Sequence, residues 1–137
     1  MSNPFEFAVS LRVTHPDIDP AVITDVLGVT PDRCWKVGDP RVTPKGAALE
    51  GVYRESHWIA ALGNGSDGEI AHCLEQALDR LSRHGTFLTD LRKGGGDLQL
   101  FVFWGGNGNT GAVLDAALLG RMAELGIDLR LDVYDSE

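Results

Sequence analysis

The sequence predicts an α+β fold in which helices cover one face of a mostly antiparallel four-stranded sheet. Two segments near the ends of the chain, residues 5–13 and 127–134, alternate apolar and polar residues, as strands with one buried face do. Between them, residues 70–81 carry apolar side chains at helical spacing, which predicts a long amphipathic helix. These patterns together favour a two-layer arrangement.

The first half of the chain supplies one strand, one short helix and a long irregular segment. After the strand at 5–13, Asp19 is placed to cap a helix with Pro20 at its first position, and Gly28 ends it. The segment from Pro31 to Leu49 is rich in proline, glycine and basic residues, and we expect a long loop with a brief strand near residues 34–37.

The middle of the chain predicts a second main strand within residues 50–62, followed by a turn at residues 63–65. Ser66 and Glu69 have the spacing of a capping box at the start of the long helix. That helix ends near His84, and residues 87–93 are expected to add a turn of helix.

The most apolar segment, residues 97–104, predicts an interior strand buried on both faces. A last helix is indicated by apolar residues at helical spacing, and a last strand follows Gly126. The helix residues are Val113, Leu114, Ala117, Leu118, Met122 and Leu125. A weak similarity between the two halves is consistent with a duplicated β-α-β unit.

The loop from Gly105 to Gly111 matches the spacing G-x-G-x-x-G after a strand and before a helix. In a dinucleotide-binding fold, such glycines let backbone N–H groups approach a phosphate at the helix N-terminus. The same residues also suit a turn in which Asn109 or Thr110 caps the helix. Because only about twenty-five residues follow, the further parallel strands of a Rossmann unit have no room, and we expect no cofactor.

Composition narrows the class of protein. The 137 residues, 43% hydrophobic and 23% charged, fit one globular domain over residues 1–137. A net charge of −8 argues against nucleic acid, because phosphate binding needs clustered lysine and arginine. No apolar run suits a membrane and no secretion signal is seen, so we expect a cytoplasmic protein.

Catalytic and metal sites are not indicated. The four histidines, His15, His57, His72 and His84, lack the spacing of converging metal ligands. Cys34 and Cys73 lie far apart and are expected to be free thiols. The sequence contains no G-x-S-x-G nucleophile elbow. Pairs of carboxylates are expected in so acidic a chain, so their presence does not indicate a catalytic site. We therefore expect a binding protein rather than an enzyme.

If helices cover one face of the sheet, the other face is open. It would carry Glu6, Ser10, Arg12, His57, Ile59, Gln99, Phe101, Phe103, Asp128, Arg130, Asp132 and Tyr134. Phe101, Phe103 and Ile59 would form an apolar centre within a charged rim, which suits a protein partner or a homo-oligomer. The alternative is that the segment from Pro31 to Leu49 folds back over these side chains.

Several short motifs resemble one small bacterial family. They are Ser10-Leu11-Arg12-Val13, Asp17-Ile18-Asp19-Pro20, Ile23-Thr24, Leu27-Gly28-Val29, Pro31, Lys36-Val37-Gly38-Asp39, Trp58 in a strand, and the ending from Leu125 to Tyr134. The chain is similar, over nearly its whole length, to the family catalogued as domain of unknown function 4279. The resemblance implies a single domain and no particular activity.

Two functional hypotheses follow. The first is a non-enzymatic protein-binding module, in its narrower form an immunity-type inhibitor that holds a basic partner through Asp128, Asp132, Asp135 and Glu137. The second is a small-ligand or phosphate-binding domain, in which amides of the loop from Gly105 to Gly111 and a basic residue such as Arg33 or Lys36 meet an anion. The candidate contact residues are Arg33, Trp35, Lys36, Phe101, Phe103, Asn107, Asn109, Asp132 and Tyr134.

Overall fold

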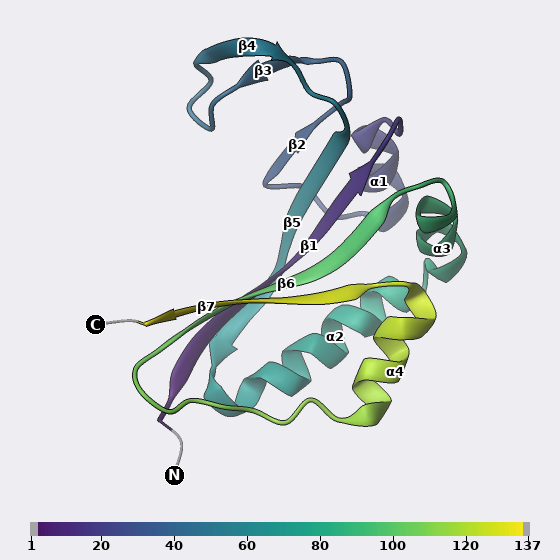
Figure 1. Ribbon diagram of the computed structural model, residues 1–137. Coiled ribbons are helices and arrows are strands. Elements are labelled where there is room, and N and C mark those ends of the chain that lie inside the picture. Colours follow the sequence, from purple (N-terminus) through teal and green to yellow (C-terminus); the bar gives the residue numbers. More distant parts are fainter. Residues whose placement is uncertain (1–2, 136–137) are drawn as a thin grey trace.

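The computed structural model describes residues 3–135 and has two layers, a twisted sheet and a layer of helices (Figure 1). The strands are β1 (Phe5–His15), β2 (Arg33–Trp35), β3 (Pro40–Val42), β4 (Ala48–Val52), β5 (Ser56–Ser66), β6 (Asp97–Gly106) and β7 (Asp128–Asp135). The helices are α1 (Pro20–Leu27), α2 (Ile70–Ser82), α3 (Gly85–Lys93) and α4 (Ala116–Leu125), and a 3₁₀ turn, η1 (Asp67–Glu69), precedes α2. The predicted α+β class is confirmed.

The main sheet has five strands in the order β2-β5-β1-β6-β7, so the predicted number of four was one too few. The fifth strand is β2, which lies close to the brief strand expected near residues 34–37 and was not counted in the sheet. Its three residues pair antiparallel with residues 57–59 of β5. The sheet is mixed, because β7 runs parallel to β6 after the crossover through α4. Since β1 and β5 instead pair antiparallel, the two halves do not share one β-α-β topology.

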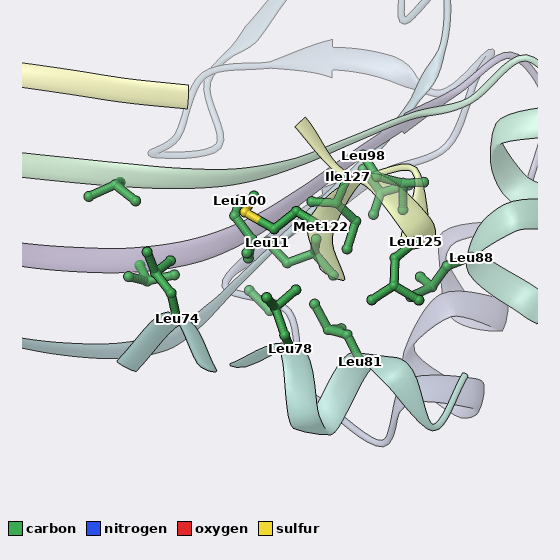
Figure 2. Packing of buried hydrophobic residues seen from close by; sticks show 14 of the residues in the cluster. Leu11, Leu74, Leu78, Leu81, Leu88, Leu98, Leu100, Met122, Leu125 and Ile127 are labelled. Carbon is green, nitrogen blue, oxygen red and sulfur yellow. The ribbon is translucent and has the colours of Figure 1, made fainter. Parts of the chain in front are cut away.

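The core lies between the sheet and the helices. Alternate residues of β1, from Phe5 to Val13, are at most 3% exposed, and so are Leu98, Leu100 and Val102 of β6. Figure 2 shows how leucines of α2 and α3 meet these strands together with Met122 of α4. Within residues 3–135, no helix has the length and apolar character that crossing a bilayer requires.

Residues 63–65 are strand rather than the predicted turn. They continue β5 and pair with residues 7–9 of β1, after a register shift between Val9 and Ser10. The glycines are needed here for close packing, because a Cβ on Gly63 would lie 2.8 Å from Sγ of Cys73. On Gly65, a Cβ would lie 3.0 Å from the ring of Phe7. The Ser66–Glu69 capping box that follows is present as predicted.

The last helix begins later than its apolar pattern indicated. Helix α4 starts at Ala116, and its N-cap is Asp115, whose Oδ1 accepts a hydrogen bond of 2.9 Å from the N–H of Leu118. The hydroxyl of Thr110 is not a cap, since it accepts a hydrogen bond from Nε1 of Trp104 at 3.0 Å. Residues 87–93, expected to form one turn, belong to the nine-residue helix α3.

The segment from Pro31 to Leu49 does not cover the sheet. It forms β2 and then the β3–β4 hairpin, which stands beyond the end of the main sheet (Figure 1). The hairpin is joined to the sheet through Tyr53, whose ring stacks on Trp35 of β2 at 4.4 Å. On β6, Phe103 is left 40% exposed, so that strand is buried on one face rather than two.

Candidate functional site

The strand face turned away from the helices forms one continuous surface, which we call the open sheet face. Strand register decides its membership, because paired residues project to the same side. Arg33 of β2 pairs with Ile59 of β5, which pairs with Arg12 of β1. The face comprises Ser10, Arg12, Arg33, Trp35, His57, Ile59, Gln99, Phe101, Phe103, Asp128, Arg130, Asp132 and Tyr134.

Two arginines lie over one phenylalanine at the centre of this face. The guanidinium carbon of Arg12 is 3.7 Å from the ring centroid of Phe101, and that of Arg130 is 5.4 Å away. Both distances are within the range of a cation–π interaction. Nε of Arg12 is buried and has no hydrogen-bond partner among the described residues. Burial lowers the pKa of Arg12, and the positive charge of Arg130 lowers it further.

A second aromatic group lies at the β2 end of the face. Trp35 stacks between Tyr53 and His57, with centroid distances of 4.4 and 4.3 Å, and the guanidinium of Arg33 lies 4.8 Å from the Trp35 ring. His57 is half-buried, and its pKa is lowered first by burial and then by the positive charges of Arg12 and Arg33. His57 is therefore neutral at pH 7.

The β7 side of the face is acidic and aromatic. Phe103 stacks on Tyr134 at a centroid distance of 5.1 Å, and the two rings are 40% and 51% exposed. The Tyr134 hydroxyl donates a hydrogen bond of 2.8 Å to Oδ2 of Asp132. This hydrogen bond and the charge of Asp132 raise the pKa of Tyr134. The face thus combines exposed aromatic rings with charges of both signs.

In the part of the chain that the structure describes, no carboxylate forms an ion pair with the arginines of the open sheet face, although the negative charge of Asp132 acts on Arg12 and opposes the lowering of its pKa by burial. Within residues 3–135, the ion pairs join Asp17 to His15, Asp128 to Arg92, and Asp79 to Arg121. None of them involves Arg12, Arg33 or Arg130. In an acidic chain, arginines left without such partners on an exposed aromatic surface suit contact with another molecule.

Comparison with known families assigns the chain to one of them. A family model matches residues 5–136, essentially the whole sequence. The chain belongs to the family described as domain of unknown function (DUF4279). Searches among curated proteins and among solved structures found no match. Membership confirms the resemblance seen in the sequence, and the DUF4279 match covers both the helix layer and the open sheet face.

The fold of this DUF4279 domain brings six of the nine candidate contact residues onto the open sheet face. They are Arg33, Trp35, Phe101, Phe103, Asp132 and Tyr134. Lys36 lies just beyond β2, where its N–H donates to Oδ2 of Asp39 at 3.1 Å. Asn107 and Asn109 lie in the loop after β6, and their carbonyl oxygens accept hydrogen bonds from Asn3.

The glycine loop and the basic candidates are far apart. Gly105 pairs with Glu6 of β1. Arg33 lies level with Arg12 of β1, because both pair with Ile59 of β5. Glu6 and Arg12 are six positions apart along β1, which at roughly 3.3 Å per residue is about 20 Å. A groove of about 580 Å³ does lie beside Gly105, Phe103 and Asn107, but the carboxylate of Glu6 helps to line it. That charge disfavours an anion there.

Sequence reasoning placed Arg12, Arg130 and His57 on this face but did not count them as contact residues. The alternation of residues 5–13 and 127–134 assigns Arg12 and Arg130 to the polar side of their strands, and alternation within residues 57–62 places His57 on the same side as Ile59. What it cannot give is register, which pairs Arg12 with Gln99, diagonally next to Phe101, and pairs Phe101 with Arg130. The central cluster depends on three strands from opposite ends of the chain.

Proposed function

We propose that this chain is a non-enzymatic protein-binding module and that the open sheet face holds its partner. The observation that carries the proposal is the combination of exposed rings with arginines that form no ion pair within residues 3–135, on the strand face turned away from the helices. Phe103 and Tyr134 are 40% and 51% exposed, and Arg12 lies over Phe101 at the centre. Aromatic residues and arginine are the types enriched where protein partners are bound.

The charges on the open sheet face indicate which groups the partner presents to it. Arginines occupy the middle of the open sheet face, so the partner brings an acidic or carbonyl-rich group to Arg12 and Arg33. The β7 margin of the face carries Asp128 and Asp132, which suit basic side chains around that group, whereas Asp135 projects to the helix side of β7. The net charge of −8 supports the narrower proposal of an immunity-type inhibitor of a basic partner. Glu137, assigned to the same role, lies outside the described residues.

The alternative, an anion held by the glycine loop, has less support. The loop does not open into a helix, because α4 begins five residues after Gly111 and its N-terminus is already capped by the Asp115 carboxylate. The helix-terminus contribution to anion binding is therefore missing at the loop. We also propose that the protein acts in the cytoplasm, in keeping with its free thiols, Cys34 and Cys73.

Site-specific photocrosslinking in the native host tests the proposal. A photoreactive phenylalanine analogue replaces Phe103 on the open sheet face, and in a matched control it replaces Glu75, which is exposed on α2. We expect position 103 to form a covalent adduct with one other protein species, and position 75 to give none. Adding Arg12→Gln to the position-103 variant should reduce the adduct, because the central guanidinium is lost.

The outcomes separate the alternatives. Equal adducts from both positions, or none from position 103, would contradict partner binding by this face. For the narrower proposal, the captured protein should be basic, and Asp132→Lys should lower the yield while added salt lowers it in parallel. A captured acidic protein whose yield is unaffected by Asp132→Lys would exclude an inhibitor of a basic partner but leave the binding face in place.

A further inference from the structure

Strand β7 forms one edge of the main sheet. Strand β7 is the last in the sheet order and contacts β6 on one side, and no strand within residues 3–135 pairs with its other side. It is eight residues long, from Asp128 to Asp135. An exposed edge of this length presents a row of free N–H and C=O groups that can extend the sheet into another chain.

Exposed apolar side chains mark the same strand. Leu131 and Val133, on the helix side of β7, are 46% and 66% exposed. Their neighbours in β6 are Val102 and Trp104, which are 0% and 7% exposed. The apolar side of the sheet thus continues into β7 beyond the part that the helices cover, which is an arrangement typical of an unoccupied interface.

The sequence of β7 complements itself in one register. If two copies pair antiparallel about a twofold axis through Leu131, Arg130 of each copy faces Asp132 of the other on the open side. On the helix side, Leu131 then faces itself and Leu129 faces Val133. Moving the axis to Arg130 or to Asp132 would set like charges opposite each other, which is destabilising.

Both charged groups are available for this pairing. Arg130 has no ion pair within residues 3–135, and it adds to the positive charge around Arg12. Asp132 uses Oδ2 for the Tyr134 hydroxyl, and its other carboxylate oxygen can accept from a guanidinium. A carboxylate from a second copy would therefore neutralise part of the central positive charge.

We propose that two copies of this chain form a dimer through antiparallel pairing of their β7 edges, centred on Leu131. The two five-stranded sheets join into one, and the twofold axis places both open sheet faces on the same side. This interface goes beyond the proposed function, because its partner is a second copy and its backbone pairing uses the outer edge of β7. Arg130 and Asp132 at the margin of the open sheet face take part in it, whereas Phe103 does not.

Sedimentation velocity on the full chain, over a range of concentrations, tests the charge pairing. We expect a dimer for the wild type and at least about a tenfold rise in the dimer Kd for Arg130→Asp, since two cross-strand pairs change from attraction to repulsion. The double variant Arg130→Asp/Asp132→Arg reverses both charges and should restore the dimer. Arg80→Asp, at an exposed position on α2, changes the net charge equally and should leave the dimer intact.

Cysteine crosslinking tests the register in a background of Cys34→Ser and Cys73→Ala. Leu131→Cys should form an intermolecular disulfide, since directly opposed residues have Cα atoms roughly 4.5–5.5 Å apart. Val133→Cys should not form a disulfide, because position 133 of one copy faces position 129 of the other. The two cysteines at position 133 would therefore lie four residues apart along the strands, at about 13 Å. Circular dichroism confirms that each variant is folded.

A wild-type protein that stays monomeric at its highest soluble concentration would overturn the proposal. So would a dimer that tolerates Arg130→Asp and yields no disulfide from Leu131→Cys, because another surface would then join the copies. Neither result bears on capture of a different protein at Phe103, so the two proposals fail independently.

Discussion

The two faces of the main sheet differ in burial although they are formed by the same strands. On the helix side, Leu11 and Leu100 are fully buried. One residue away on the open side, Arg12 lies over Phe101, and both side chains are only half-buried. A shift of one position along the backbone therefore moves a side chain from the packed core to a surface fit for recognition. Substitutions on the two faces should differ accordingly.

The largest effect is expected on the helix side. Leu100→Ala should lower the free energy of unfolding by about 2–5 kcal/mol, because it removes buried methyl groups and leaves a cavity among α2, α4 and β1. Urea denaturation monitored by circular dichroism measures the change. A cost below about 1 kcal/mol, the range of surface substitutions, would mean that the two faces do not differ as described.

A smaller effect is expected where the helix layer approaches β5 most closely. Gly63→Ala should destabilise the protein by about 1–2 kcal/mol, since the new Cβ would lie 2.8 Å from Sγ of Cys73 and force one of them to move. In the double variant Gly63→Ala/Cys73→Ala the sulfur is gone, and part of the stability should return. Costs of the two single changes that simply add in the double variant would exclude this contact as the cause.

Gly63 also illustrates how far the sequence predicts the fold. Alternation in residues 5–13 and helical spacing in 70–81 are local patterns, and they correctly gave β1, α2 and the two faces. Glycine is ambiguous, because a turn and a close contact require the same residue, and only the position of Cys73 distinguishes them. A brief strand was expected near residues 34–37, and β2 lies there. The sequence could not give its place at the edge of the main sheet, because that depends on pairing with residues 57–59 of β5.

The candidate site was predictable to a similar degree. Alternation assigned Phe101, Phe103 and Tyr134 to one face from sequence alone, and the structure agrees. The Arg12–Phe101–Arg130 cluster could not be foreseen, because it depends on the relative register of three strands. The expected helix cap at Asn109 or Thr110 was wrong for another reason: the spacing G-x-G-x-x-G does not specify that a helix begins there, and the N-cap of α4 is Asp115.

On the open side, the change corresponding to Leu100→Ala should matter much less for folding. Phe103→Ala removes a stacked contact with Tyr134, yet the ring is 40% exposed, so we expect a loss of at most about 1 kcal/mol in the free energy of unfolding. The same urea titration measures it beside Leu100→Ala. A cost equal to that of Leu100→Ala would indicate that Phe103 is a core residue and would weaken the proposal that it contacts a partner.

The smallest effect is expected at His57 and depends on pH. Its folded-state pKa is lowered from the ordinary 6.5, so below about pH 6.5 the unfolded chain binds more protons than the folded one. Stability associated with neutral His57 is therefore present above pH 6.5 and is lost as the pH falls through the folded pKa. His57→Phe keeps a ring against Trp35 and should flatten this part of the pH profile. The expected difference is under about 1 kcal/mol, because solvent screens a partly exposed group.

The cause of the lowered pKa of His57 can be tested separately from its effect on stability. Burial is the largest cause, and the charges of Arg12 and Arg33 add to it. Arg12→Gln removes one of these charges while keeping a long side chain beside Phe101, so the pKa of His57, followed by NMR, should rise toward 6.5 without reaching it. Arg80→Asp on α2, outside this face, should leave the pKa unchanged. If Arg12→Gln does not move it either, the positive charge does not act across the strands, and the open sheet face would lack the electrostatic centre on which partner binding is argued.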